Sequence, residues 1–223
     1  MSNSTQIAGV YLLTADTDAR DFDAVLDVVQ HALNAGVRVV QYRDKTVDVQ
    51  QRLQRASRLV ALAHAAGALL IVNDSAQVAV DSNADGVHLG RDDGDLAQAR
   101  SRLGDRLLGV SCYDALANAH KAVAGGADAL AFGSMFASVT KPAAVRAPLS
   151  LLTEARRAWP QQRIVAIGGI TTDNIGRVAQ AGAHAAAILD AVFGAKNPAH
   201  AARELILRFD EGRCRYEEQR TTV

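Results

Sequence analysis

The amino-acid sequence predicts a single-domain α/β fold built from repeated units of a strand followed by a helix. One phrase recurs with variations, as AGVRVVQYR (35–43), NADGVHLGR (83–91), GGADALAFG (125–133) and AGAHAAAIL (181–189). Each copy places a turn after an amphipathic segment and before a short apolar run, which is typical of a helix end followed by a buried strand. No Pro/Ser-rich linker or low-complexity stretch separates the copies, so we expect one domain.

The apolar runs and the segments between them give the order of the elements. Strands are expected near 9–14, 37–43, 69–74, 86–90, 107–112, 129–133, 163–169 and 185–189. Helices are expected at about 22–35, 48–66, 75–82, 96–103, 114–125, 149–159, 172–181 and 197–209. Short, nearly all-apolar strands that alternate with helices indicate a parallel sheet covered by helices. Eight such strands favour closure into a (β/α)8 TIM barrel, with an open doubly wound sheet as the alternative.

Composition excludes several classes of function. The 223 residues carry 24 basic and 24 acidic side chains, so no overall field recruits nucleic acid or an anionic membrane. No apolar run approaches the roughly 18 residues of a membrane span, and Cys112 and Cys214 form no disulfide framework or CxxC metal pair. We therefore expect a cytoplasmic protein with a barrel over 1–209 and a polar tail over 210–223 that is exposed or disordered. The sequence leaves a homo-oligomer open.

The first candidate site residues lie in QYRDK (41–45), because the chemistry of a barrel of this kind gathers at the carboxyl ends of the strands. Gln41, Arg43 and Lys45 share one face at the end of an expected strand, with Asp44 on the other face. Three side chains rich in hydrogen-bond donors suit an anion. The alternative is a solvated strand end with an ion pair, but the apolar run upstream favours a buried strand and an anion site.

Two acidic residues follow the third and fourth expected strands. Asp74 and Asp93 could each be a helix N-cap, because a helical segment follows each of them. At one rim, opposite a cationic cluster, they have a second interpretation as oxygen ligands of Mg²⁺, which typically takes one or two carboxylates and leaves its other positions to phosphates and water. An anion site beside a magnesium site suggests a pyrophosphate group as the ligand.

Two further rim segments are candidates for phosphate binding. The stretch 132–148 carries Ser138, Thr140 and Lys141, and loops of this length inside a compact domain are usually functional. The alternative is a loop without a ligand. The glycine pair at 168–169 follows the seventh expected strand, where glycine lets a phosphate approach backbone N–H groups closely.

Histidine and cysteine contribute little to the expected chemistry. The six histidines show no zinc-ligand spacing, and only His88, on an expected strand, could approach the rim. Cys112 has no evident base partner and is expected to be a packed thiol rather than a nucleophile.

Several ordered motifs resemble those of the thiamine-phosphate synthase family, also called thiamine-phosphate pyrophosphorylases. They are QYRDK, IVND, ADGVHLGRDD, GVSCYD, the SVTK of the sixth loop and AIGGI, and they run from about residue 9 to residue 209. The resemblance implies a TIM barrel that uses Mg²⁺ to join 4-amino-2-methyl-5-hydroxymethylpyrimidine diphosphate to 4-methyl-5-(2-phosphooxyethyl)thiazole, giving thiamine phosphate and pyrophosphate. It also implies a dissociative reaction, in which diphosphate leaves and the thiazole nitrogen captures a pyrimidine methylene cation.

The resemblance implies a role for each candidate residue. Asp74 and Asp93 would bind magnesium. The residues expected around the pyrimidine diphosphate are Gln41, Arg43, Lys45, Asn73, Ser111 and Lys141. Those expected around the thiazole phosphate are Ser138, Thr140 and Gly169, with the backbone of Leu189 and Asp190. The residues expected to take part in catalysis are Arg43, Lys45, Ser111 and Lys141.

Three positions depart from the pattern of the family. The sixth loop begins GSMFAS, where the family usually has Gly-Pro and then a Thr in place of Ser138. Arg91 stands where Gln is common, which adds positive charge beside the expected metal site. Asp190 stands where Ser is usual, and a carboxylate near a phosphate repels it. We therefore expect the side chain of Asp190 to point away from the phosphate.

Two other functions fit parts of the sequence. A thiazole tautomerase of a related barrel handles one thiazole phosphate by proton transfer, but its relatives lack the second aspartate and have a His where Tyr113 stands. A non-catalytic protein that senses a phosphorylated metabolite would not need the complete set of Asp74, Asp93, Lys45 and Lys141. Both observations favour the synthase.

Overall fold

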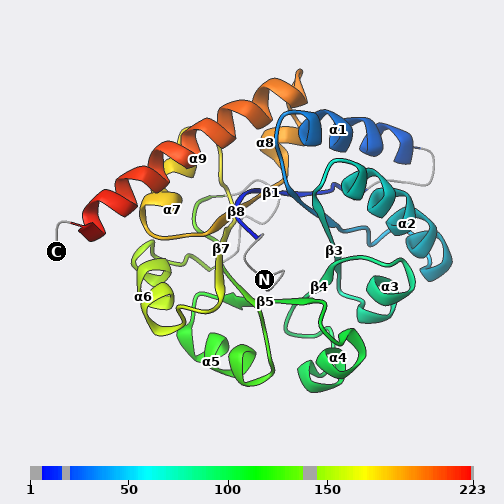
Figure 1. Ribbon diagram of the computed structural model, residues 1–223, viewed down its shortest axis with the longest axis horizontal. Coiled ribbons are helices and arrows are strands. Elements are labelled where there is room, and N and C mark those ends of the chain that lie inside the picture. Colours follow the sequence, from blue (N-terminus) through cyan, green and yellow to red (C-terminus); the bar gives the residue numbers. More distant parts are fainter. Residues whose placement is uncertain (1–6, 17–20, 138–144, 222–223) are drawn as a thin grey trace.

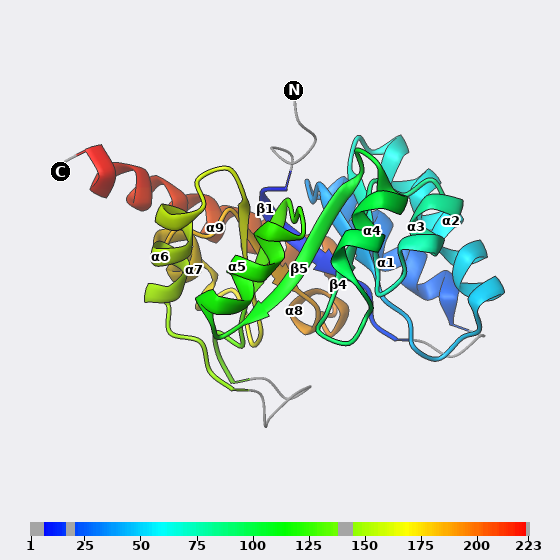
Figure 2. The same cartoon turned by 90° about the horizontal axis from the view of Figure 1, so that it is seen from below.

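The computed structural model describes residues 7–16, 21–137 and 145–221, and it confirms the predicted TIM barrel. The strands are β1 (Gly9–Leu13), β2 (Val39–Tyr42), β3 (Leu69–Asn73), β4 (Gly86–Leu89), β5 (Leu107–Tyr113), β6 (Ala129–Phe132), β7 (Arg163–Ile167) and β8 (Ala185–Ile188). All neighbours are parallel, and the barrel closes because β1 pairs with both β2 and β8. Seen down its axis, the barrel is surrounded by helices (Figure 1), and Figure 2 shows it from the side.

The helices within the described residues are α1 (Phe22–Asn34), α2 (Val49–Ala65), α3 (Ala76–Asp81), α4 (Leu96–Leu103), α5 (Leu116–Ala124), α6 (Ser150–Ala158), α7 (Ile175–Gln180), α8 (Asp190–Phe193) and α9 (Pro198–Thr221). The first seven lie where helices were predicted, with ends that differ by at most three residues. The sequence missed α8, because four residues are too few to show a helical period. No helix of the described chain is long and apolar enough to cross a membrane.

The C-terminal tail is exposed for the most part, and it is helical through residue 221. Residues 210–221 continue α9 as a helix that projects beyond the barrel (Figure 1). Gly212 packs so closely on α7 that a Cβ atom there would lie 2.2 Å from the carbonyl oxygen of Gly176. Farther along, the guanidinium carbon of Arg156 lies 4.5 Å from the centre of the Tyr216 ring. These contacts hold residues 210–221 against the rest of the protein, although this polar segment has no apolar stripe along the helix.

The strands separate two apolar layers, because successive side chains of a strand point to opposite faces. From β1, Val10 and Leu12 pack outward against the helices, whereas Tyr11 and Leu13 pack into the barrel. The interior layer consists of Ile7, Tyr11, Leu13, Val39, Leu69, Ile71, Leu107, Ala129, Ala131, Val165, Ala185 and Ala187. This layer fills the barrel, so polar chemistry is left to the strand ends.

Candidate active site

The predicted anion-binding residues follow one another from the barrel interior to its rim at the end of β2. Gln41 is buried, and its Nε2 donates a hydrogen bond to the Tyr11 hydroxyl at 3.1 Å. At the rim, Nη1 of Arg43 lies 2.5 Å from the Asp16 carboxylate. The same carboxylate accepts a hydrogen bond from the backbone N–H of Lys45 at 3.0 Å. Asp16, which the sequence did not single out, therefore holds the two cationic residues together.

Asp44 lies apart from these donors, as the strand alternation predicted. It is buried and forms an ion pair with Arg55 of α2. Its second carboxylate oxygen accepts hydrogen bonds from the backbone N–H and the hydroxyl of Thr46, at 3.0 and 2.7 Å. Arg55 in turn lies 4.8 Å from the centre of the Phe22 ring. Because these contacts satisfy Asp44, they fix the loop that carries Lys45.

Two carboxylates and one ammonium group meet at the ends of β3 and β4. Nζ of Lys45 lies 3.2 Å from Oδ2 of Asp74, and Oδ2 of Asp93 accepts a hydrogen bond from the Gly90 N–H at 2.6 Å. Burial raises the pKa of Asp93 and the Gly90 N–H lowers it. Asp74 raises this pKa again through a hydrogen bond and its charge, whereas Lys45 lowers it. The two aspartates, nineteen positions apart in the chain, therefore interact directly.

The alternative interpretation of the two aspartates as helix N-caps is wrong. Ser75 caps α3, with its side chain accepting from the Val78 N–H at 3.2 Å. Asp95 caps α4, with its side chain accepting from the Gln98 N–H at 2.9 Å. Asp74 also has a φ of 66°, which a residue other than glycine rarely adopts and which is frequent at functional sites. The two predicted metal ligands are thus not engaged in capping.

A pair of carboxylates suits a hard cation that keeps other ligands of its own. Among the described residues, no group of three or more His, Cys, Asp or Glu side chains could enclose a metal ion. Mg²⁺ is commonly held by one or two carboxylates, with water and substrate phosphates completing its octahedron. Asp74 and Asp93, with Lys45 beside them, fit that requirement.

A half-buried histidine lies next to Ser111 at the base of the site. Nε2 of His88 on β4 lies 2.9 Å from Oγ of Ser111 on β5, and Gly109 leaves room for the ring, because a Cβ atom there would lie 2.7 Å from His88 Nδ1. Burial lowers the pKa of His88 to about 4, against the charge of Asp74, so the ring is neutral near pH 7. The alternation of GVHL (86–89) contained the signal that this ring points into the barrel.

The two residues after Ser111 have opposite environments. Cys112 is buried, and burial raises the pKa of its thiol to about 12, which confirms a packed thiol. Tyr113 is exposed, has a φ of 56° and lies where the register between β5 and β6 shifts. Its hydroxyl accepts a hydrogen bond from the Arg91 N–H at 3.2 Å. The guanidinium carbon of Arg91 lies 4.7 Å from the centre of the Tyr113 ring.

The loops after β6 and β7 interlock at the glycine pair. The N–H of Phe136 donates to the Gly168 carbonyl at 2.9 Å. Gly168 and Gly169 have φ values of 100° and 61°. A Cβ atom on Gly168 would lie 2.2 Å from Ser134 Oγ, and one on Gly169 would lie 2.2 Å from the Ala137 carbonyl oxygen. Glycine is therefore needed here for its backbone angles and for the close approach of the sixth loop, a reason that the sequence did not reveal.

The far side of the glycine loop is held by Asn174. Its Nδ2 donates to the Gly169 carbonyl at 3.0 Å, and its Oδ1 accepts from the Thr171 N–H at 2.9 Å. These bonds set the backbone direction at the position predicted to meet the thiazole phosphate. The other three predicted contacts from the sixth loop lie outside the described residues; they are Ser138, Thr140 and Lys141.

The eighth strand ends directly before the short helix α8. The Leu189 carbonyl accepts hydrogen bonds from the N–H groups of Val192 and Phe193, at 3.1 and 3.0 Å. Asp190 is the first residue of α8 and is exposed. The orientation of its carboxylate relative to a bound phosphate stays a prediction.

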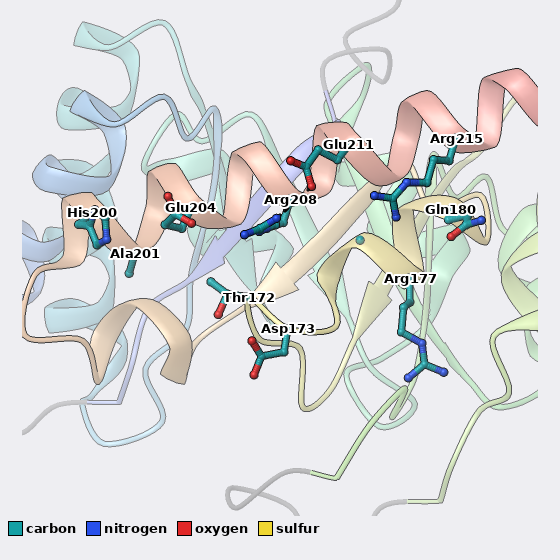
Figure 3. A pocket seen from close by; sticks show the side chains of 11 residues that line it. Thr172, Asp173, Arg177, Gln180, His200, Ala201, Glu204, Arg208, Glu211 and Arg215 are labelled. Atoms are coloured by element: carbon teal, nitrogen blue, oxygen red, sulfur yellow. Dashed lines mark hydrogen bonds and ion pairs between the residues drawn. The ribbon is translucent and has the colours of Figure 1, made fainter.

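A groove of about 570 Å³ lies away from the predicted site, on the outside of the barrel between α7 and α9 (Figure 3). Its charged lining is mixed, so no single charge dominates it. The charged residues along it, apart from His200, are Asp173, Glu204, Glu211, Arg177, Arg208 and Arg215. None of the predicted site residues lines this groove.

Comparisons with known proteins agree with the motifs at the rim. A family model described as thiamine monophosphate synthase matches residues 10–192. A thiamine-phosphate synthase of Chromobacterium violaceum is 48% identical over 203 residues, which are 90% of this chain and 95% of that protein. The corresponding protein of Methylococcus capsulatus is 48% identical over 208 residues, which are 93% of this chain and 92% of that protein.

Solved structures show the same relationship. A thiamine phosphate pyrophosphorylase from Pyrococcus furiosus superimposes with a TM-score of 0.84 at 29% sequence identity, covering 94% of this chain and 99% of that chain. A 3-hexulose-6-phosphate synthase from Salmonella typhimurium superimposes with a TM-score of 0.71 at 18% identity, covering 91% of this chain and 99% of that chain. The second likeness is one of fold alone.

Proposed function

Because the chain belongs to the thiamine monophosphate synthase family, we propose that the barrel rim described above is where it makes thiamine phosphate. The activity is a group transfer from a pyrimidine diphosphate to a thiazole phosphate. The observation that carries the assignment to the rim is the meeting of Lys45, Asp74 and Asp93 at the ends of neighbouring strands. Parallel strands bring their carboxyl ends to one edge, which is where barrels of this kind bind their substrates.

The pyrimidine diphosphate is assigned to the side of the rim formed by β2 to β5. Its phosphates would meet the cations of Arg43, Lys45 and Lys141, and its ring would lie over Gln41, Asn73 and Ser111. Support comes from the position of Ser111, whose hydroxyl contacts the neutral His88. A histidine without charge orients a hydroxyl without repelling the cation that forms when diphosphate leaves.

Magnesium is assigned to Asp74 and Asp93. When bound, it would neutralise charge on the phosphate oxygens of the substrate and on the departing pyrophosphate. Lys45 contacts Asp74 already, so it lies where it can exchange a carboxylate for a phosphate oxygen as its partner. The protein therefore offers both a divalent site and a fixed cation to the same leaving group.

The reaction needs no protein nucleophile. The bond between the pyrimidine methylene carbon and the diphosphate oxygen breaks, and its electron pair leaves with pyrophosphate. The resulting methylene cation is captured by the lone pair of the thiazole nitrogen, which forms the new carbon–nitrogen bond. The buried, protonated thiol of Cys112 is consistent with this, because it cannot act as a thiolate near neutral pH. Positioning and charge stabilisation are the work left to the protein.

The thiazole phosphate is assigned to the side formed by β6 to β8. Backbone N–H groups at Gly169 and at residues 189–190 would receive the phosphate, together with Ser138 and Thr140. Support comes from Asn174, which fixes the carbonyl of Gly169 and so the direction of the neighbouring backbone. The cytoplasm is the proposed compartment, since both cysteines are free thiols.

The experiment is a turnover assay on the purified chain. Thiamine phosphate and pyrophosphate should form only when pyrimidine diphosphate, thiazole phosphate and Mg²⁺ are all present. EDTA should abolish both products, and Mg²⁺ added in excess should restore them. Full activity in EDTA would contradict the metal role. Isomerisation of a thiazole phosphate without diphosphate would instead indicate a tautomerase, and tight binding without turnover would indicate a sensor.

A further inference from the structure

Arg91 differs from the other described cations of the rim in its surroundings. Arg43 pairs with Asp16, and Lys45 pairs with Asp74. Within the described residues, no ion pair joins Arg91 to a carboxylate; its guanidinium lies over the ring of Tyr113, 4.7 Å from the ring centre. A guanidinium on an aromatic face keeps the hydrogen-bonding edges of its fork free for a ligand.

Two hydrogen bonds fix the backbone of the loop that carries Arg91. The Gly90 N–H donates to Oδ2 of Asp93 at 2.6 Å, and the Arg91 N–H donates to the Tyr113 hydroxyl at 3.2 Å. A Cβ atom on Gly90 would lie 2.9 Å from that carboxylate oxygen and 3.6 Å from that hydroxyl. The phenol of Tyr113 thus contacts both the backbone and the guanidinium of Arg91.

The backbone of Tyr113 is adapted to this contact. Its φ of 56° lies in the left-handed region, and the strand register shifts between Ser111 and this residue. A strand residue in that conformation redirects its side chain, which is a known use of irregularities at barrel rims. The strain is local to the residue that supports Arg91.

The strand order places Lys45 and Arg91 on the loops after β2 and β4, which flank β3. Lys45 follows β2 and contacts Asp74 after β3. Arg91 follows β4, and its guanidinium lies over the ring of Tyr113 at the end of β5. Asp74 lies between these two loops, and Asp93 follows β4 on the same loop as Arg91. A diphosphate bound at the two carboxylates therefore has Lys45 on the β2 side and Arg91 on the β4 side.

We propose that Arg91, positioned by Tyr113, binds phosphoryl oxygens of the diphosphate substrate and of the pyrophosphate that leaves it. The inference rests on the proposed function of the rim and adds Arg91 to Arg43, Lys45 and Lys141, the cations already assigned to the diphosphate. Arg91 touches the leaving group, whereas Tyr113 acts through Arg91 as a positioning residue. A planar fork can hold two oxygens at once, which an ammonium group cannot do.

The direct test is the binding of inorganic pyrophosphate with Mg²⁺, measured by isothermal titration calorimetry without any turnover. Arg91→Gln should weaken binding about ten-fold, which corresponds to the loss of one charge-assisted contact. Arg91→Lys should fall between wild type and Arg91→Gln, because it keeps the charge and loses the fork. Arg102→Gln is the matched control, since it removes the same charge from an exposed position on α4.

The role of Tyr113 is tested by its dependence on Arg91. Tyr113→Ala should weaken pyrophosphate binding nearly as much as Arg91→Gln, and the double variant should be no weaker than Arg91→Gln alone. In turnover, both single variants should raise KM for the pyrimidine diphosphate and leave KM for the thiazole phosphate unchanged. A purely structural role of Tyr113 would lower thermal stability without this split.

The outcomes separate this inference from the function on which it rests. If wild type binds pyrophosphate and Arg91→Gln binds it as Arg102→Gln does, the inference is wrong and the proposed function stands. If wild type neither binds pyrophosphate with Mg²⁺ nor makes thiamine phosphate, the proposed function itself fails. Additive losses in the double variant would overturn the positioning role of Tyr113 alone.

Discussion

The two ends of the barrel use polar side chains in opposite ways. At the amino end, the residues directly before β4, β6 and β8 are polar, and each accepts a hydrogen bond from a backbone N–H of the strand before it. The bonds are Leu70 N–H to Asp85 at 2.8 Å, Leu108 N–H to Asp128 at 2.8 Å, and Ile164 N–H to Nδ1 of His184 at 3.0 Å. The same position of the repeated phrase thus has this role in three of its four copies, whereas in the fourth copy Arg38 donates to the carbonyls of Leu33 and Val37.

These amino-end groups are satisfied by the fold itself. Nη2 of Arg100 donates to Asp128 at 2.6 Å and to the Gly126 carbonyl at 2.7 Å. Burial lowers the pKa of His184 to about 3, so its ring stays neutral and accepts a hydrogen bond without charge. At the carboxyl end, by contrast, Asp74 and Asp93 face each other. Lys45 pairs with Asp74, but the pKa of Asp93 stays raised by burial and by the charge of Asp74, so this end of the barrel is less well balanced than the amino end.

The largest expected effect tests the carboxyl end. Asp93→Asn should lower kcat/KM by about 100-fold or more, because even residues behind metal ligands typically contribute 10–100-fold. The melting temperature should stay the same or rise, since the change removes repulsion between Asp93 and Asp74. The measurements are steady-state turnover and thermal unfolding of the metal-free protein.

The neighbouring Asp92 supplies the control for this prediction. Asp92 is exposed and no described hydrogen bond or ion pair involves it, so Asp92→Asn should keep turnover close to wild type. Equal losses in the two variants would show a general effect of charge at the rim. A clear loss of stability in Asp93→Asn would show that the carboxylate is structural, in which case the contrast between the two ends does not hold.

The second effect tests the amino end. Asp128→Ala leaves the Leu108 N–H without its acceptor and removes the carboxylate partner of Arg100, which should reduce the free energy of unfolding by about 2 kcal/mol. Turnover per folded molecule should not change, because the residue lies at the other end of the barrel. Urea unfolding and a turnover assay in the absence of urea measure the two properties.

Asp105→Ala is the matched variant for this end of the barrel. Asp105 is exposed in the turn before β5, and its removal should change the free energy of unfolding by no more than about 0.5 kcal/mol. If Asp128→Ala changed the free energy of unfolding as little as Asp105→Ala, the side-chain hydrogen bonds to backbone N–H groups at the amino end would contribute little stability. A fall in kcat for Asp128→Ala at full stability would contradict the division of labour between the ends.

The fold was predictable because its signals are local and repeated. Short apolar runs gave the position of every strand, and the turn residues gave helix ends within three residues for α1 to α7. The remainder depended on contacts between distant segments. The helical tail needs Gly212 to pack on Gly176, and nothing in the composition of residues 210–221 signals that approach.

The identity of the site residues could be predicted from the sequence better than the contacts that they make. Alternation within QYRDK placed Asp44 away from its neighbours, and the pairing of Asp74 with Lys45 follows from the strand ends meeting. The sequence could not show that Asp16 binds the Arg43 guanidinium and the Lys45 backbone N–H, because a loop residue has no periodic pattern. The sequence also did not show that the sixth loop approaches Gly169, which is a second reason for glycine there beside the predicted phosphate contact.

The smallest expected effect concerns Asp190, the one acidic residue expected beside the thiazole phosphate. Two like charges within about 4–6 Å disfavour binding, so a carboxylate that is tolerated there must point away and leave the backbone at 189–191 to hold the phosphate. Asp190→Ser should therefore leave KM for the thiazole phosphate unchanged or lower it by at most about three-fold, without altering KM for the pyrimidine diphosphate. Asp105→Ser removes the same charge at the amino end and should change neither constant. A large rise in KM for the thiazole phosphate would mean that the carboxylate has a positive role at the start of α8, and that charge at the carboxyl end is also used to hold the fold.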